Sequence, residues 1–293
     1  MSDEMLEIAR RNAPIVGEAI GFENTEFVKG TIDDMTVNLE VVDEYLKEHP
    51  IQSSEGLYEY EAYVEKLRDE NVLIADGSID VIVSNCVLNL VDQNKKKCMF
   101  DEMFRVLKVG GRCVISDIVS DEDIPLEMQK DPDLWSGCIS GAYQESDFIK
   151  AFEDAGFVGI ETLKYDDDPW KVVGGIELRS VTVRAYKPSS ESCYEGYQAV
   201  IYKGPFKSVE DDDNHVFERG ARSAVCKKTF ELLSKEGYRE HFVLIEPNES
   251  ANPLSTEKFD FSRKYRHPQE TKGAKVKSQN NSSCCEPNAS SCC

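Results

Sequence analysis

The chain up to residue 187 alternates short apolar runs with amphipathic segments. Apolar residues recur at helical spacing over residues 4–18, where Pro14 is a potential break. Further elements follow at regular intervals: strands are expected over 26–32, 78–86, 112–117, 160–165 and 180–186, and helices over 93–107 and 144–155. The last two strands are expected to pair antiparallel. Alternating strands and helices of this kind predict a doubly wound α/β sheet.

Other parts of the chain break this pattern. Residues 38–68 form a polar insertion rich in Glu and Tyr, which we expect to be surface loop and short helix. After Pro188 come strands over 198–202 and 241–245 with a helix over 220–234, which indicates a small α+β module. From residue 264 the chain is polar and poor in aromatics, a composition typical of disorder. The predicted organisation is therefore a main domain over 1–187, a small α+β domain over 188–263 and a disordered Cys-rich tail over 264–293.

Charge and cysteine content narrow the function classes. The formal charge of −21 argues against nucleic acid or an anionic membrane as partner. No apolar run approaches the roughly 20 residues of a membrane helix. The acidic N-terminus lacks the order of a signal peptide, so a cytoplasmic location is expected. In such a compartment the 10 cysteines favour thiol chemistry or soft-metal binding over disulfides.

Cys86 stands out by its position. It directly follows the apolar strand over 78–85, and ligands of open α/β sheets bind outside the carboxyl ends of the strands. A free cysteine is more often a small buried hydrophobe. At this position the thiol is either inert or a soft nucleophile or metalloid ligand.

The remaining reactive side chains form few recognisable patterns. The folded part has no Cys-x-x-Cys pair, which disfavours zinc, and no histidine sits in a nucleophile motif, which disfavours a hydrolase. We expect Cys98 and Cys113 to be core or surface residues, and assign Cys193 and Cys226 no catalytic role. The tail pairs, Cys284-Cys285 and Cys292-Cys293, either chelate soft ions or are passive.

Three motifs carry a family resemblance. The helix over 102–107, followed by Val109-Gly110-Gly111 and a strand, resembles class I S-adenosylmethionine-dependent methyltransferases, and we expect the two glycines to cap that helix. The phrases around the two cysteines, VSNCVLNLV (83–91) and LWSGCISGA (134–142), narrow the resemblance to the arsenite methyltransferases. An ordinary small-molecule methyltransferase needs no thiol at either place.

The resemblance implies a reaction and a site. Cys86 and Cys138 would be the catalytic pair that binds As(III), since soft thiolates select soft ions. The arsenic lone pair would then attack the methyl group of S-adenosylmethionine. Thr31, Ile32, Asp33 and Asn85 would line the adenine side of the cofactor, although Asp33-Asp34 also suits a helix N-cap. The substrate would be arsenite or its thiol conjugates, and glutathione or thioredoxin would supply reducing equivalents.

The resemblance also implies a gap in the cofactor cleft. The chain has no glycine-rich turn near its start, and its first residues resemble those that follow the acidic end of the second strand in the family. The expected fold is therefore an N-terminally incomplete class I methyltransferase sheet. A non-catalytic thiol protein that binds metalloids is the rival hypothesis. A methyltransferase for an ordinary organic substrate leaves the two cysteine phrases unexplained.

Overall fold

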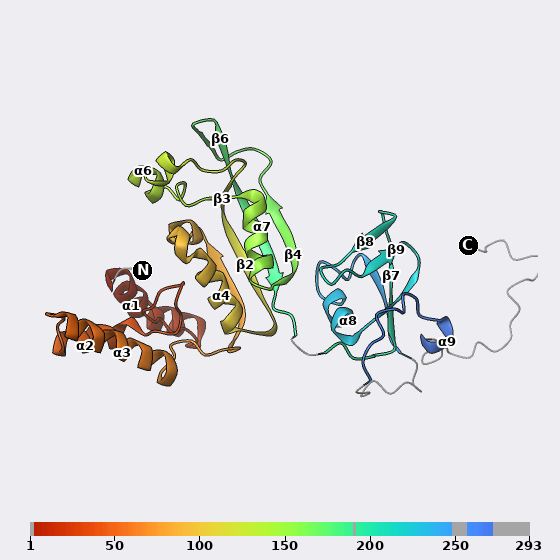
Figure 1. Ribbon diagram of the computed structural model, residues 1–293, viewed down its shortest axis with the longest axis horizontal. Helices are drawn as coiled ribbons and strands as arrows, with labels where there is room; N and C mark the ends of the chain where they lie inside the picture. The colour runs from red at the N-terminus through yellow and green to blue at the C-terminus, as the bar shows by residue number, and fades with distance from the viewer. Residues whose placement is uncertain (1–2, 190–191, 248–256, 272–293) are drawn as a thin grey trace, which may run out of the picture. The chain divides into compact units, whose positions relative to one another are not determined.

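The computed structural model describes residues 3–189, 192–247 and 257–271. The chain divides into two compact units (Figure 1). The first ends at Pro188 and the second begins at Ser189. Within the described residues, no helix is long and apolar enough to cross a membrane.

The first unit is built on a mixed sheet. Its strands run in the order β1 (Ile79–Asn85), β2 (Leu107–Ser120), β6 (Ile176–Tyr186) and β4 (Val158–Tyr165). β1 is parallel to β2, whereas β6 is antiparallel to both β2 and β4, as predicted for the last two strands. Two short strands extend the sheet: β3 (Tyr143–Gln144) beside β2 and β5 (Lys171–Val173) beside β6. The predicted α/β fold is confirmed.

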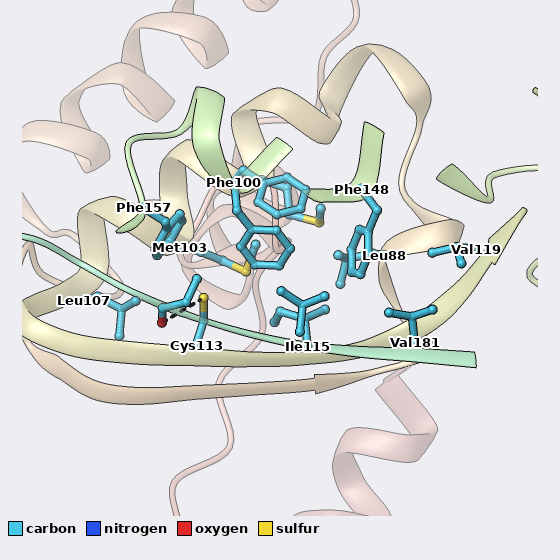
Figure 2. Packing of buried hydrophobic residues seen from close by; sticks show 14 residues of the cluster. Leu88, Phe100, Met103, Leu107, Cys113, Ile115, Val119, Phe148, Phe157 and Val181 are labelled. Atoms are coloured by element: carbon cyan, nitrogen blue, oxygen red, sulfur yellow. Dashed lines mark hydrogen bonds between the residues drawn. The ribbon is translucent and has the colours of Figure 1, made fainter. Parts of the chain in front are cut away.

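Two helices cover one face of this sheet. α4 (Lys96–Val106) and α7 (Glu145–Asp154) place Phe100 and Phe152 edge to face, with ring centroids 4.9 Å apart. Figure 2 shows the ring of Phe100 over Cys113 and Ile115 of β2, which are completely buried. Burying one such phenylalanine contributes about 1.5–3 kcal/mol. On the opposite face of β1, Val81 and Val83 are 39% and 75% exposed.

The segment before β1 contains more helix than the sequence predicted. α1 (Asp3–Ile20) continues through Pro14. The polar insertion forms two helices, α2 (Leu39–Glu48) and α3 (Ser54–Glu70), rather than loop and one short helix.

The strand expected over 26–32 is absent. Its backbone bonds to irregular partners instead: Phe27 O accepts from the Arg10 side chain, and Lys29 O accepts from Leu39 N at 3.0 Å. Only an isolated bridge between Thr31 and Asp34 remains.

The Gly110-Gly111 pair does not cap α4. The helix ends at Val106, and the N–H of Leu107 closes its last turn on Met103 O. The glycines lie inside β2, where the pairing with β1 shifts between Ile79 and Val81. A Cβ on Gly111 would lie 2.8 Å from Lys108 O, so the bulge requires a residue without a side chain.

The second unit has a sheet of its own. β7 (Gln198–Tyr202) pairs antiparallel with β10 (Arg222–Val225) and with β11 (Phe242–Ile245), and β8 (Ser208–Glu210) pairs with β9 (Val216–Glu218). The helix expected over 220–234 is wrong in its first half. Residues 222–225 pair with β7 as a strand, and α8 (Lys227–Leu233) begins only after Cys226.

The second unit extends beyond the expected limit of 263. Tyr265 bridges Ser223, and Arg266 is buried and bonds Glu195 at 2.6 Å. A short helix, α9 (Pro268–Thr271), follows. Residues 264–271, assigned to the tail from their polarity, are therefore part of this unit. The N–H of Ala224 donates to Lys264 O at 3.1 Å, and the N–H of Arg266 donates to Arg222 O at 2.9 Å. The tail cysteines lie outside the described residues.

Candidate functional site

Cys86 lies at the carboxyl end of β1. Its N–H donates to Ser116 O at 2.9 Å, which continues the pairing with β2 for one more residue. Its backbone then turns into the left-handed region, with φ 54°. This conformation is uncommon for residues other than Gly, Asn and Asp. It ends the strand. The thiol is left exposed, with Sγ 3.4 Å from the Asn85 side-chain oxygen.

Cys138 lies on a loop that reaches the same place. α5 (Leu126–Gln129) and α6 (Pro132–Ser136) precede it, and Asp131 caps α6 through its side chain. Cys138 also has a left-handed backbone, with φ 60°. Its Sγ is 3.8 Å from the carbonyl oxygen of Cys86. The two cysteines singled out from the sequence are therefore neighbouring residues at the carboxyl end of β1.

Asn89 fastens the two cysteine segments together. It belongs to the 3₁₀ turn η1 (Leu88–Leu90) after Cys86 and is 1% exposed. Its amide nitrogen donates to Ile118 O at 2.7 Å and to Cys138 O at 3.2 Å. A buried amide that satisfies two carbonyls holds both in place, because leaving either unpaired is costly.

Gly141 allows the close approach of this loop. A Cβ built there would lie 1.9 Å from the backbone oxygen of Asn89, a separation that no side chain can adopt. The Cys138 loop and the η1 turn thus pack backbone to backbone.

The carboxylate of Asp117 lies close enough to Cys86 and Cys138 to interact electrostatically with both thiols. It is buried in β2 and accepts backbone N–H groups from Leu88 at 2.9 Å and Ile118 at 2.8 Å. Burial raises its pKa above the usual value, and these hydrogen bonds act in the opposite direction.

Both thiols are held in their protonated form. Burial raises the pKa of Cys86, and the charge of Asp117 raises it further. The pKa of Cys138 is raised by burial, then by Asp117 and by Cys86. Neither thiol is therefore an activated thiolate at neutral pH.

Lys96 holds the loop that carries Cys138 through a hydrogen bond to its backbone. It is the first residue of α4, is buried, and donates to the carbonyl of Gly141. Its ammonium group also lies 4.0 Å from the centre of the Tyr143 ring. Burial lowers its pKa to about 8, against the opposing effect of Asp117.

Of the four residues predicted to bind the cofactor, Asn85, Ile32 and Asp33 lie near the segment that contains Cys86, and Thr31 is exposed. Asn85 ends β1 and pairs with Ser116. Ile32 packs against the core cluster that contains Leu88, and Asp33 forms an ion pair with Lys95 at 2.9 Å, so this turn lies beside the chain that follows Cys86.

The alternative interpretation of Asp33-Asp34 as a helix N-cap is wrong. Asn38 caps α2, and Asp34 instead accepts hydrogen bonds from Thr36 and from Arg68.

Four residues of the site were not singled out from the sequence: Asn89, Lys96, Asp117 and Gly141. Asp117 had a usable signal, since it ends the strand expected over 112–117, and this strand pairs with the one that leads to Cys86. The others depend on contacts between distant segments. In the part of the chain that the structure describes, no three His, Cys, Asp or Glu side chains converge on a metal site.

Family models match two parts of the chain. Residues 47–156 match the model described as Methyltransferase domain, and residues 189–276 match a domain of unknown function (DUF8838).

Curated proteins that match are named arsenite methyltransferase. The protein of Aquipseudomonas alcaligenes is 28% identical over 259 residues, which cover 84% of this chain and 64% of that protein. The human protein is 28% identical over 252 residues, covering 82% and 64%. The protein of Halobacterium salinarum is 36% identical over 125 residues, covering 40% and 32%. The chain spans less than two thirds of the length of these relatives.

A solved structure supports the fold. The crystal structure of an arsenic(III) S-adenosylmethionine methyltransferase from Chlamydomonas reinhardtii matches 89% of this chain and 78% of that chain, with a TM-score of 0.51 and 23% identity. The class I methyltransferase fold and the expected resemblance are both confirmed: the chain contains a methyltransferase domain and is similar in sequence to proteins named arsenite methyltransferase.

Proposed function

We propose that this chain takes part in methyl transfer from S-adenosylmethionine to thiol-bound As(III), with Cys86 and Cys138 holding the arsenic. One observation carries the proposal: Cys138 Sγ lies 3.8 Å from the carbonyl oxygen of Cys86, at the carboxyl end of β1. A pair of neighbouring thiols is a soft, bidentate ligand. The resemblance of the two cysteine phrases to those of the arsenite methyltransferases is the reason to name arsenic.

The protonated state of the two thiols suits the binding step. Arsenous acid exchanges two hydroxyl groups for two sulfur atoms, and each thiol proton leaves with a hydroxyl as water. The raised pKa values of Cys86 and Cys138 therefore do not oppose binding, because the exchange needs no net loss of protons. The bound arsenic keeps its lone pair, which is the nucleophile of the methyl transfer.

The described residues fit the adenosine side of the cofactor. Ile32 offers an apolar contact and Asp33 a carboxylate acceptor, beside the segment that follows Cys86. Together with Thr31 and Asn85 they would hold that end of S-adenosylmethionine. When bound, the cofactor supplies a methyl carbon made electrophilic by its sulfonium.

The supporting residues act as positioning groups. Asn89 fixes the carbonyl of Cys138, and Lys96 fixes the carbonyl of Gly141 in the same loop. Asp117 organises the η1 turn and adds negative charge beneath the thiols. Their contribution is to hold two sulfur atoms at a fixed separation, which favours binding by lowering its entropic cost.

The wider assignments follow from the same proposal. Residues 1–187 would be the methyltransferase domain and the module from 188 an accessory domain. A thiol reductant such as glutathione or thioredoxin would restore trivalent arsenic, and the cytoplasm supplies both. The rival, a non-catalytic metalloid-binding protein, draws no support from the relatives.

Calorimetric titration tests the proposal. The full chain, with Cys193 and the four tail cysteines (Cys284, Cys285, Cys292 and Cys293) replaced by Ser, is titrated separately with arsenite and with S-adenosylmethionine. Arsenite binding should weaken at least about tenfold in Cys86→Ser and in Cys138→Ser, because one thiol of a bidentate pair is lost. Cys98→Ser, an exposed thiol on α4, is the matched control and should bind as before.

Each outcome of these titrations decides between the hypotheses. Arsenite binding without cofactor binding would favour the rival. Cofactor binding with arsenite affinity unchanged in both variants would contradict both hypotheses.

A further inference from the structure

A second pair of neighbouring thiols lies in the second unit. Cys193 is half-buried in the segment that enters this unit, and Cys226 is completely buried at the N-terminus of α8. Both pack with Phe259 in one small apolar cluster.

The backbone holds these two residues side by side. The N–H of Lys227, next to Cys226, donates to the carbonyl of Tyr194, next to Cys193, at 3.2 Å. On its other side the segment is fixed by Phe259 N, which donates to Cys193 O at 2.8 Å. This hydrogen bond and the shared packing against Phe259 bring the two cysteines close together, which a disulfide requires.

The sulfur of Cys226 is held in place by the first turn of α8. Its Sγ accepts the N–H of Thr229 at 3.4 Å and lies 3.3 Å from the hydroxyl of that residue. The pKa of Cys193 is raised to about 11, first by burial and then by the neighbouring Cys226, whereas Lys228 lowers it. Exchange at Cys193 should therefore speed up as the pH rises and its thiolate fraction grows.

We propose that Cys193 and Cys226 form a reversible disulfide within the second unit. The oxidant is a low-molecular-weight disulfide such as oxidised glutathione. The Cys193 thiolate attacks one sulfur of glutathione disulfide, forms a mixed disulfide and releases one glutathione. The Cys226 thiolate then attacks the Cys193 sulfur and releases the second glutathione. Two thiols lose two electrons, and their two protons end on the two glutathione molecules.

The disulfide would fasten the entering segment to the core of the second unit. It closes a loop that contains β7, β8, β9 and β10. A cross-link of this span restricts the unfolded chain, so the thermal midpoint of this unit should rise on oxidation by roughly 10–25 °C. This inference is independent of the arsenic site.

Peptide mapping of the full chain tests the proposal. The protein is incubated with oxidised glutathione, free thiols are trapped by alkylation, and tryptic peptides are analysed by mass spectrometry. The expected product is a disulfide between the peptide ending at Lys203 and the peptide ending at Lys227. It should disappear in Cys193→Ser and in Cys226→Ser, and persist in Cys98→Ser.

The contrary results are equally specific. Recovery of both thiols as free or as separate glutathione adducts would overturn the proposal, as would linkage of Cys193 to a tail cysteine. Should Cys226→Ser fail to fold because its sulfur is buried, Cys193→Ser alone decides. In that variant Cys226 must be recovered without an intramolecular disulfide partner.

Discussion

The side-chain amide of Asn89 reaches across the sheet end to the carbonyl of Cys138, at 3.2 Å. Its second hydrogen bond, to Ile118 O at 2.7 Å, anchors the same amide to β2. The turn after one thiol thereby fixes the loop that carries the other. The geometry of the thiol pair depends on this amide more than on any direct contact between the sulfurs.

Replacing Asn89 by Ala should loosen the thiol pair. Two buried carbonyls lose their donor, so the free energy of unfolding should fall by about 1–3 kcal/mol. Arsenite affinity should fall as well, because the Cys138 loop loses its anchor. Chemical denaturation and calorimetry measure the two effects. Unchanged affinity in a folded Asn89→Ala would show that the amide does not position the site.

Gly141→Ala should damage the site, whereas Gly137→Ala should not. The new Cβ at 141 would collide with the backbone of Asn89 at 1.9 Å. At 137 the nearest atoms lie at 3.5 Å, an ordinary contact, and the backbone φ of −84° suits Ala. Thermal unfolding and arsenite titration of the two variants provide the comparison. Equal effects at both positions would contradict the close packing described.

Lys96 should give the protein a pH-dependent stability. Its pKa is about 8 in the folded state, below the usual 10.5, so the unfolded chain binds more protons between these values. Its contribution to the unfolding free energy therefore rises from pH 8 to pH 10.5, by roughly 3 kcal/mol.

Lys96→Met should abolish that rise. Urea unfolding at several pH values measures it, with the exposed Lys97→Met as control. A parallel pH dependence in wild type and Lys96→Met would exclude the proposed role of burial.

Asp117→Asn should make the site thiols more reactive. The carboxylate charge raises the pKa of both Cys86 and Cys138, so its removal lowers them and increases the thiolate fraction near neutral pH. Site-resolved alkylation rates from mass spectrometry measure this, with the exposed Asp123→Asn as control. Slower alkylation of the two thiols in a folded Asp117→Asn would reverse the electrostatic argument.

The spacing of apolar residues correctly predicted elements that depend on contacts within one segment of the chain. β1, β2 and α7 follow apolar periodicity and helix-ending signals, and Cys86 was identified because a strand end is visible in the sequence. The segment over 26–32 has a similar apolar pattern, but its backbone partners lie at Arg10 and Leu39 and prevent a strand. A strand needs a neighbour, and sequence alone does not show where that neighbour is.

The sequence predicted the two cysteines of the site but not the residues that position them. Asn89 and Gly141 act through a contact between segments far apart in the chain, so neither has a local signal. The thiol pair of Cys193 and Cys226 was missed for the same reason. The α8 boundary at Cys226, displaced from the expected helix start, brings that sulfur to Cys193.

X-ray absorption at the arsenic edge tests the central claim most directly. The sample is the full chain with the four tail cysteines and Cys193 replaced by Ser, loaded with one equivalent of arsenite. We predict two sulfur neighbours for arsenic, and one or none after Cys86→Ser or Cys138→Ser. The same two sulfurs in both variants would contradict the account, because arsenic would then be held elsewhere.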